Sequence, residues 1–406
     1  MRDLSFPFRI AFLTHEPFYP PSGGGSAEAV YLVEELVRRG HEVHVFCPQL
    51  AEPDAVMDRF HVHLHPFTTW TMGRYARFRN FKYLLYPSFL QRLVARAVRS
   101  GPFDLLLSQH AISAVAAGRL KKKLRVPVVM NFPDLLTGFM ETWPAWLAPR
   151  PLVEALKRYE ISMPARYDVD GVLAISDTLA DYFAERGYPR EKILPIYYGY
   201  AADHFPFQPR DGRENRPPVV AMHGSFDAHH LGDIAFHAAE HVTQRRPGTV
   251  FRFIGQRTVG LEKFLRRARA GIPGFQFEST GFVPYAEVAH RLSDASVGIV
   301  PYEESAGTHC AFVAKVVEYV ASGLPTVCTP LQSIRRYFQN DPLVRFAAFD
   351  GADFGAKIID WLATSPPSWQ VQAAKSAARV QTELDWRPLC RRAVDFIEQV
   401  YTRSRR

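Results

Sequence analysis

The fold is decided by one segment of the chain, Lys315-Val-Val-Glu318-Tyr-Val-Ala-Ser-Gly323-Leu-Pro325-Thr-Val-Cys-Thr329. Its first half has the apolar spacing of an amphipathic helix, which Gly323 ends before Pro325 turns the chain into a short apolar strand. Lys315 and Glu318 are one helical turn apart and therefore share a face of the helix. An acid such as Glu318 is rare inside a buried helix without a partner, so the segment also predicts a binding site.

The same alternation of helix and strand extends outward from this segment. A strand at 8–14, a helix at 27–39 and a strand at 41–47 form a βαβ unit, which implies parallel strands and a right-handed crossover. Further strands are predicted at 60–64, 105–108, 126–131 and 172–175, and then at 218–222, 250–254, 275–278 and 297–300. Strands that alternate with helices in this way are typical of doubly wound α/β domains.

Two such domains fit the length of 406 residues, because each half is long enough to bury its own core. Between 199 and 218 the composition shifts to Pro, Gly, Asp and Arg without apolar periodicity, which indicates a linker. We therefore predict an N-terminal domain at 1–200, a linker at 201–217 and a C-terminal domain at 218–385.

The sequence shows no sign of secretion or of a membrane span. Its four cysteines lie far apart and lack metal-ligand spacing, so we expect reduced thiols. The N-terminus lacks the apolar stretch of a signal peptide, and no apolar run is long enough to cross a bilayer. These features predict a cytoplasmic protein.

The net charge of +8 is unevenly distributed along the chain. No Asp or Glu occurs from 59 to 103, a window rich in arginine, and a second basic run follows at 119–125. Two interpretations are open: solvated helix faces, or a patch for anionic lipid headgroups or a phosphate-bearing acceptor. The second would make the protein peripheral on the inner face of the membrane. Nucleic acid is not predicted, because no nucleic-acid module accompanies the charge.

The glycine-rich loop before the first helix does not predict a nicotinamide enzyme. Gly23, Gly24 and Gly25 let backbone N–H groups approach an anion at the start of the helix. A dinucleotide fingerprint starting at Gly23 would need glycine where Glu28 stands, and the second strand does not end in an acid that could bind a ribose. The sequence contains no P-loop either.

A series of short motifs, in this order, resembles the retaining glycosyltransferases of family 4 (glycosyltransferase group 1), which have the GT-B fold. The motifs are the glycine loop at 23–25, Arg39-Gly-His-Glu-Val43, Ala174-Ile-Ser176, Gly199 with Phe205, Gly281-Phe-Val283, Lys315-x-x-Glu318-Tyr319 and a terminal helix after Trp386. The resemblance implies two Rossmann-like domains that face each other across a cleft. The N-terminal domain would bind the acceptor and the C-terminal domain the nucleotide sugar, while the helix at 386–406 would pack back on the N-terminal domain.

The resemblance also implies a set of site residues. Donor and nucleotide binding would fall on Gly24, Gly25, Gly224, Ser225, Phe282, Val283, Gly307, Thr308, Lys315 and Glu318. Glu318 would bind the ribose, the backbone at Phe282 would read the base, and the loop at Gly307 would seat a phosphate at a helix start. His110 would be the catalytic side chain near the reacting carbon, and Asp134 would lie in the acceptor pocket.

The chain departs from the family pattern at the donor phosphates. Ser225 and His230 stand where relatives commonly carry an arginine and a lysine that clamp the diphosphate. Cys310 stands where the first acid of a common Glu pair would be. Lys315 is then the best available cation for the phosphates, because it lies on the same helix face as Glu318.

We predict a glycosyltransferase that moves a sugar, with retention, from a nucleoside-diphosphate sugar to a carbohydrate or lipid-linked acceptor, such as a polysaccharide intermediate of the cell envelope. No cofactor or metal is predicted, because helix dipoles and cationic side chains can stabilise the leaving diphosphate. His61, His63 and His65, expected on one face of a strand, leave a zinc site open as a minor alternative. Two rival functions are a glycosyltransferase-like binding protein that has lost catalysis, which the missing clamp favours, and an epimerase or phosphorylase of similar architecture.

Overall fold

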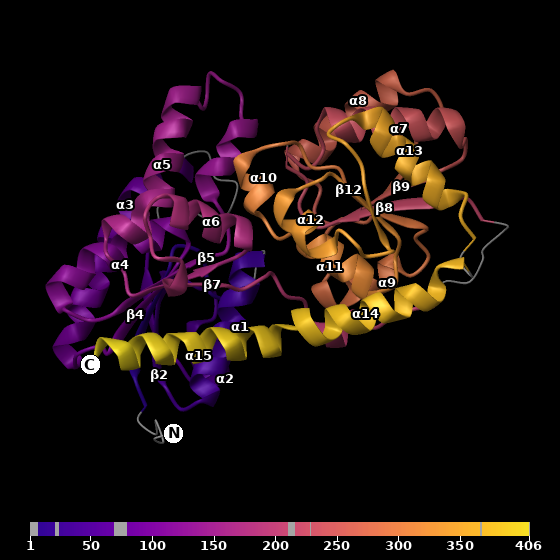
Figure 1. The fold of residues 1–406 in the computed structure, drawn as a ribbon. Helices are drawn as coiled ribbons and strands as arrows, with labels where there is room; N and C mark the ends of the chain where they lie inside the picture. Colours follow the sequence, from indigo (N-terminus) through magenta and orange to yellow (C-terminus); the bar gives the residue numbers. More distant parts are fainter. Residues whose placement is uncertain are drawn as a thin grey trace. The chain divides into compact units, whose positions relative to one another are not determined.

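The computed structural model of this chain describes residues 7–20, 24–68, 79–209, 216–227, 229–365 and 368–405, and the side chains of all of these except 24–26 and 79–84. The chain forms two compact units (Figure 1). The first contains Met1–Thr137, Glu154–Tyr198 and Trp386–Arg406, and the second contains Gly138–Val153 and Gly199–Asp385.

The first unit is built on a sheet of parallel strands. Its elements are β1 (Arg9–Thr14), α1 (Gly24–Arg38), β2 (Glu42–Pro48), α2 (Pro53–Phe60), β3 (His63–Phe67), α3 (Arg79–Ala97), β4 (Leu105–Gln109), α4 (His110–Leu124), β5 (Val128–Phe132), the later part of α5 (Arg150–Arg166), β6 (Gly171–Ala174), α6 (Asp177–Glu185), β7 (Ile193–Pro195) and α15 (Trp386–Ser404). The strand order is β3-β2-β1-β4-β5-β6-β7, and each described pairing is parallel. The central strands β4 and β5 are buried at every position, as a parallel sheet covered on both faces requires.

The second unit repeats this design. Its elements are β8 (Val219–His223), α7 (Asp233–Arg245), β9 (Val250–Ile254), α8 (Val259–Gly271), β10 (Gln276–Ser279), α9 (Tyr285–Leu292), β11 (Val297–Val300), α10 (Ala306–Cys310), α11 (Ala314–Ala321), β12 (Thr326–Cys328), α12 (Gln332–Phe338), β13 (Val344–Phe346), α13 (Gly351–Leu362) and α14 (Gln370–Leu384). Its strand order is β10-β9-β8-β11-β12-β13, again with parallel pairings. Helices α7 and α13 pack side by side (Figure 1), where a Cβ on Gly351 would meet His237 Cβ at 2.4 Å. Short 3₁₀ turns lie at Val98–Ser100, Leu136–Thr142, Arg190–Lys192 and Ala202–His204.

In both sheets, the first three strands are added toward one edge and the later strands toward the other edge. The reversal falls between β1 and β4 in the first unit and between β8 and β11 in the second. In open α/β sheets, ligands bind at the carboxyl ends of the strands beside this point. The residues that directly follow these strands, such as His110 after β4 and Gly224 after β8, are therefore well placed for a site.

The last helix, α15, completes the core of the first unit. It packs on α1 (Figure 1), and the ring of Trp386 lies against those of Tyr31 and Tyr198 at centroid distances of 5.6 and 4.9 Å. Leu389 and Ile397 extend the same apolar contact. The core of this unit therefore depends on residues from the far end of the chain.

The strand expected at 60–64 is wrong. The chain is helical up to Phe60, because Pro53 starts α2 and the buried Val56 and Phe60 have helical spacing. His61 ends this helix in the left-handed conformation with φ 51°, and β3 begins only at His63. The three histidines therefore do not share one strand.

The first residues of the predicted linker are part of the second unit. Phe205 is buried, and a Cβ on Gly323 would lie 2.6 Å from the ring of Phe207. The N–H of Gln208 donates to the Ser322 carbonyl at 3.3 Å. The apolar rings explain this packing, while residues 210–215 lie outside the described part of the chain.

Candidate functional site

The carboxyl end of β8 forms a turn that requires glycine. Gly224 has φ 98°, a conformation that side chains disfavour, and its N–H donates to the Ile254 carbonyl at 2.8 Å. The neighbouring Gly255 lies so close that a Cβ on it would meet the Gly224 oxygen at 2.2 Å. Gly224 is exposed and Ser225, which follows, is half-buried, so a ligand can reach this strand end.

Glu318 on α11 is buried beside this turn, with 3 % of its surface exposed. Both of its carboxylate oxygens are bound: His223 Nε2 lies 2.6 Å from Oε2, and the Tyr285 hydroxyl donates to Oε1 at 2.7 Å. His223 is the last residue of β8, and its backbone N–H donates to the hydroxyl of Tyr319 at 3.2 Å. The adjacent Tyr319 thus fixes the helix against the strand end, which places Glu318 at the carboxyl edge of the sheet.

Lys315 lies one turn before Glu318 and is also buried, with 9 % exposed. Its ammonium donates to the Tyr302 hydroxyl at 2.9 Å. A Cβ on Gly224 would lie 3.1 Å from Lys315 Nζ, so the lysine reaches the turn at the end of β8. A cation and a carboxylate therefore flank one strand end.

His230, which stands in the place of the expected clamp lysine, joins the same group of side chains. It is buried, and its ring centroid lies 4.5 Å from that of Tyr302. Its Nδ1 accepts the backbone N–H of Asp227 at 3.0 Å, which leaves the ring proton of the neutral form on Nε2. His230 is thus a neutral hydrogen-bond donor, and Lys315 supplies the positive charge.

Gly307 and Thr308, where a phosphate seat is expected, lie at the start of α10. Thr308 is fully buried and serves the N-terminal capping box of α10 with Ser305, so its hydroxyl is occupied locally. The start of the helix is closed further by Glu141, whose carboxylate accepts the N–H of Ala306 at 2.7 Å. Backbone packs against Gly307 so tightly that a Cβ there would lie 2.4 Å from the nitrogen of Phe139. These contacts hold the start of α10 in place, and the phosphate seat expected at Gly307 and Thr308 stays a prediction.

The segment expected to read the base is open to solvent. Phe282 is 78 % exposed and Val283 is half-buried, between β10 and α9. Gly281 precedes them with φ 73°, where glycine is favoured, and it pairs with Gly255 in an isolated bridge. This bridge connects the base segment to the turn at Gly224.

In the first unit, three polar residues lie side by side near the carboxyl ends of neighbouring strands. The register pairs Thr14 with Gln109 and Gln109 with Asn131. His110 follows at the start of α4 with φ 65°, an uncommon conformation for a residue with a side chain. Its ring meets that of His15 edge-on at 4.9 Å, and its Nε2 lies 3.8 Å from a carboxylate oxygen of Glu16.

The other residues expected in this unit lie at the same edge of the sheet. Asp134 is half-buried just after β5, and Gly24 and Gly25 are the first two residues of α1. Beside them is a buried carboxyl group that the sequence analysis did not select, Glu28, which accepts a hydrogen bond from Asn131 at 3.0 Å. Burial raises the pKa of Glu28 to about 7, and the Asn131 bond offsets part of that rise.

Two clusters among the described residues have the atoms to ligate a metal ion: Glu42 with His44 and His63, and Asp227 with His229 and His230. In the first, the register of β2 and β3 pairs His44 with His63, but Arg9 Nε already lies 3.1 Å from the Glu42 carboxylate. The guanidinium group of Arg9 therefore already takes the position at the Glu42 carboxylate that a metal ion would need. In the second, His230 Nδ1 is engaged by backbone.

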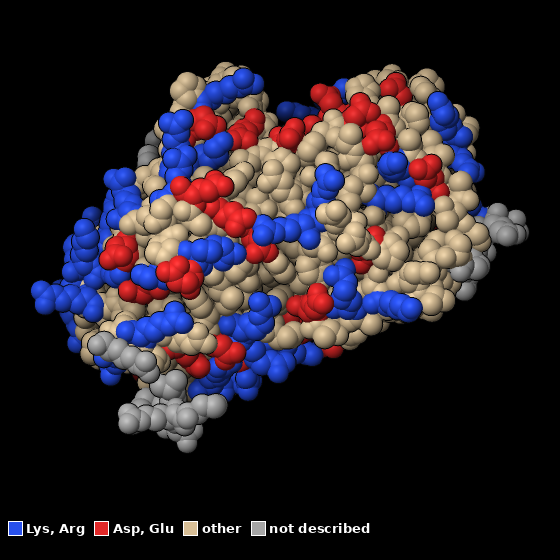
Figure 2. Space-filling model, in the orientation of Figure 1, with Lys and Arg blue, Asp and Glu red and all other residues tan. Residues whose placement is uncertain are grey.

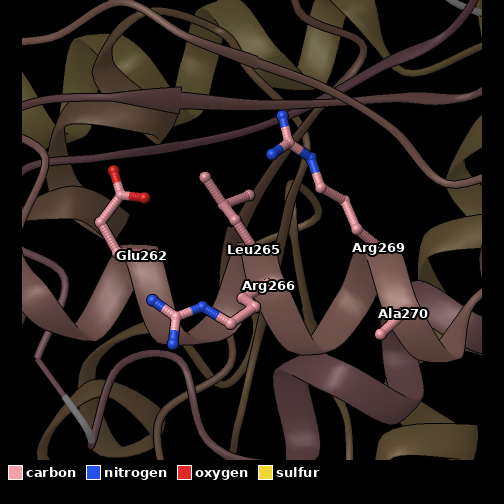
Figure 3. A pocket seen from close by; sticks show the side chains of 5 residues that line it. All are labelled: Glu262, Leu265, Arg266, Arg269 and Ala270. Atoms are coloured by element: carbon pink, nitrogen blue, oxygen red, sulfur yellow. The ribbon is translucent and has the colours of Figure 1, made fainter.

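A shallow hollow on the second unit lies apart from these residues. It is lined by one face of α8, with Glu262, Leu265, Arg266, Arg269 and Ala270 (Figure 3). Glu262 pairs with Arg257 and Arg269 stacks on Phe277, so these two charged side chains have partners close by. It contains none of the predicted site residues.

Two family profiles match most of the chain. The "Glycosyl transferase 4-like domain" matches residues 23–199, and "Glycosyl transferases group 1" matches residues 217–364. The chain belongs to glycosyltransferase family 4. This glycosyltransferase is thus a retaining enzyme that takes its sugar from a nucleotide-sugar donor, as the sequence motifs predicted. No curated protein matches it significantly in sequence.

Solved structures of similar fold cover almost the whole glycosyltransferase. HepE of Anabaena in complex with UDP and glucose is 15 % identical, with a TM-score of 0.71 over 97 % of this chain and 100 % of that one. Sucrose-phosphate synthase of Thermosynechococcus elongatus is 14 % identical (TM-score 0.77, 97 % and 99 %). WaaG, a glycosyltransferase involved in lipopolysaccharide biosynthesis, is 16 % identical (TM-score 0.64, 96 % and 99 %). These likenesses confirm the predicted GT-B fold. No helix in the described ranges is long and apolar enough to cross a membrane.

Proposed function

We propose that this glycosyltransferase binds a uridine diphosphate sugar at the carboxyl end of β8. Glu318 binds a ribose hydroxyl, and Lys315 neutralises the diphosphate. Its single strongest support is the buried pair itself, a carboxylate and an ammonium one helical turn apart beside the exposed Gly224. The similar Anabaena protein HepE has been solved with UDP and with UDP-glucose, which favours uracil as the base and a hexose as the sugar.

Neighbouring groups complete the proposed donor site. Backbone at Gly224 and Ser225 contacts the phosphates, with His230 Nε2–H as an additional donor. The open segment of Phe282 and Val283 contacts the base. These groups are neutral, so Lys315 carries the charge that relatives divide between an arginine and a lysine.

The N-terminal unit supplies the acceptor side in this proposal. His110 hydrogen-bonds the donor sugar near its reacting carbon, and Asp134 with the α1 start at Gly24 and Gly25 contacts the acceptor. The positive φ of His110 supports a special role, because strained backbone conformations persist mainly where function needs them. In the reaction, the bond from the sugar carbon to the diphosphate oxygen breaks and a bond to the acceptor hydroxyl oxygen forms on the same face, while the hydroxyl proton passes to the departing diphosphate.

A panel of sugar nucleotides, scored for hydrolysis and transfer by mass spectrometry, tests the donor. We expect turnover with a UDP-hexose. Glu318→Gln should weaken UDP binding by about 1–2 kcal/mol in calorimetry, since a charge-assisted hydrogen bond to the ribose becomes a neutral one. Glu287→Gln, an exposed acid on α9, is the matched control. Equal UDP affinity in Glu318→Gln and the unaltered enzyme would remove Glu318 from the site.

We further propose a lipid-linked acceptor at an anionic membrane surface. On α3 and the turn after it, Arg92, Arg96 and Arg99 are exposed at helical spacing. α3 packs on α4, whose end carries exposed basic residues of the 119–125 run, and Lys and Arg gather over both helices (Figure 2). Residues 69–78 of the acid-free window lie outside the described part of the chain.

Vesicle flotation tests this surface. The enzyme should float with anionic vesicles at low salt, and it should remain in the bottom fraction of the gradient with neutral vesicles. Arg92→Gln with Arg96→Gln should weaken binding by about 2 kcal/mol, because each basic residue near such a surface contributes about 1 kcal/mol. The control pair is Arg245→Gln with Arg246→Gln, exposed on the second unit. Equal flotation with neutral and anionic vesicles would contradict a membrane-binding surface and would favour the interpretation of these arginines as a solvated helix face.

A further inference from the structure

We propose that the hydroxyl of Tyr285 is a placeholder for the donor ribose: in the free enzyme it occupies the carboxylate oxygen of Glu318 that a ribose hydroxyl takes in the complex. The inference rests on the proposed function, because it assumes that Glu318 binds the ribose. It adds a residue that sets nucleotide affinity and ribose specificity and that no motif of the sequence indicated.

The two bonds to Glu318 differ in a way that decides which one can exchange. His223 holds Oε2 from inside β8 and is buried, and its backbone is fixed by the strand pairings and by the hydroxyl of Tyr319. Tyr285 holds Oε1 from the first residue of α9 and is 42 % exposed. The histidine bond is therefore part of the framework, whereas the tyrosine bond faces the solvent side of the site.

The surroundings of Tyr285 allow its side chain to leave Glu318. Its ring packs on two rings of the segment after the first unit, those of Phe205 at 5.2 Å and His204 at 5.8 Å, and the residue is 42 % exposed. The residue follows directly on the segment that starts at Gly281 with φ 73°. A rotation about the side-chain bonds of Tyr285 moves its hydroxyl without breaking a strand or a helix.

A buried carboxylate explains why a placeholder is needed. An unpaired carboxylate oxygen in an enclosed site loses its hydration, and a hydrogen-bond donor restores part of that energy. Tyr285 supplies the donor while the site is empty, and a ribose hydroxyl replaces it one for one. A deoxyribose lacks the hydroxyl, so it leaves the tyrosine in place and gains nothing from Glu318.

Tyr285→Phe tests this exchange, with UDP and its 2′-deoxy and 3′-deoxy analogues titrated in calorimetry. UDP should bind 2- to 10-fold more tightly to Tyr285→Phe, since it no longer competes with a hydrogen bond worth about 0.5–1.5 kcal/mol. The analogue that lacks the hydroxyl facing Glu318 should bind the variant and the unaltered enzyme equally. Tyr337→Phe, which removes a tyrosine bond to Glu383 elsewhere in the same unit, is the matched control.

Each other outcome has a definite meaning. Unchanged or weaker UDP binding by Tyr285→Phe overturns the placeholder, and weaker binding would make Tyr285 a direct contact of the nucleotide. A gain of equal size for all three nucleotides also overturns it, because the effect would not depend on the ribose. Glu318→Gln separates the two proposals: if Glu318 matters for UDP but Tyr285→Phe gives no gain, only the placeholder fails.

Discussion

Lys315→Ala should lower the affinity of the enzyme for UDP by about 3 kcal/mol, roughly 100-fold, because loss of one member of a buried charge pair typically costs 2–5 kcal/mol. Lys315 is buried beside Gly224 and bonded to Tyr302, so its charge reaches the strand end where the diphosphate is proposed to lie. The residues at the usual clamp positions, Ser225 and His230, do not replace it, since His230 already accepts a backbone hydrogen bond.

The decisive measurement compares UDP with UMP in calorimetry. Only UDP carries the distal phosphate, so Lys315→Ala should weaken UDP binding clearly more than UMP binding. Lys263→Ala, an exposed lysine on α8, controls for the change in net charge. Equal losses for the two nucleotides would show that Lys315 has a structural role and does not bind the distal phosphate.

His110→Ala should reduce turnover by at least 100-fold while the dissociation constant of UDP stays within a factor of two or three. Removal of one preorganised hydrogen bond to charge that develops in a transition state costs about 10²–10³ in rate. A contact that matters mainly in the transition state lowers kcat more than it changes donor binding.

His110→Asn guards this result against a folding defect, because asparagine tolerates positive φ better than alanine does. His61→Asn is a matched control, since His61 also has positive φ, at 51°, but is exposed at the end of α2. An unchanged turnover number in both His110 variants would remove this residue from the mechanism.

The sequence predicts the two α/β folds well because the alternation of apolar strands and amphipathic helices is strong throughout. It fails at 60–64, where the apolar Phe60 and Val62 fit the alternation of a strand, while Val56 and Phe60 fit the turn of a helix. Tertiary packing decided between them, since Phe60 stacks edge-on with Phe18 at 5.4 Å.

The proposed donor site was predictable only in part. Lys315 and Glu318 share a helix, so their spacing alone places them together. His223, Tyr285 and Tyr302 come from β8, α9 and the loop after β11, and only the folded sheet brings them to Glu318 and Lys315. The sequence does not tell whether Thr308 caps a helix or binds a phosphate, because a capping residue and a phosphate-binding residue have the same sequence signature.

The path of the chain between the two units bears on how this enzyme can be dissected. The chain passes from one unit to the other at 137/138, 153/154, 198/199 and 385/386. Neither unit is therefore a continuous piece, and an expression clone cut at residue 200 would leave the N-terminal half without Trp386, Leu389 and Ile397 of its own core. A frameshift or stop codon near residue 385 would damage the unit encoded at the opposite end of the gene.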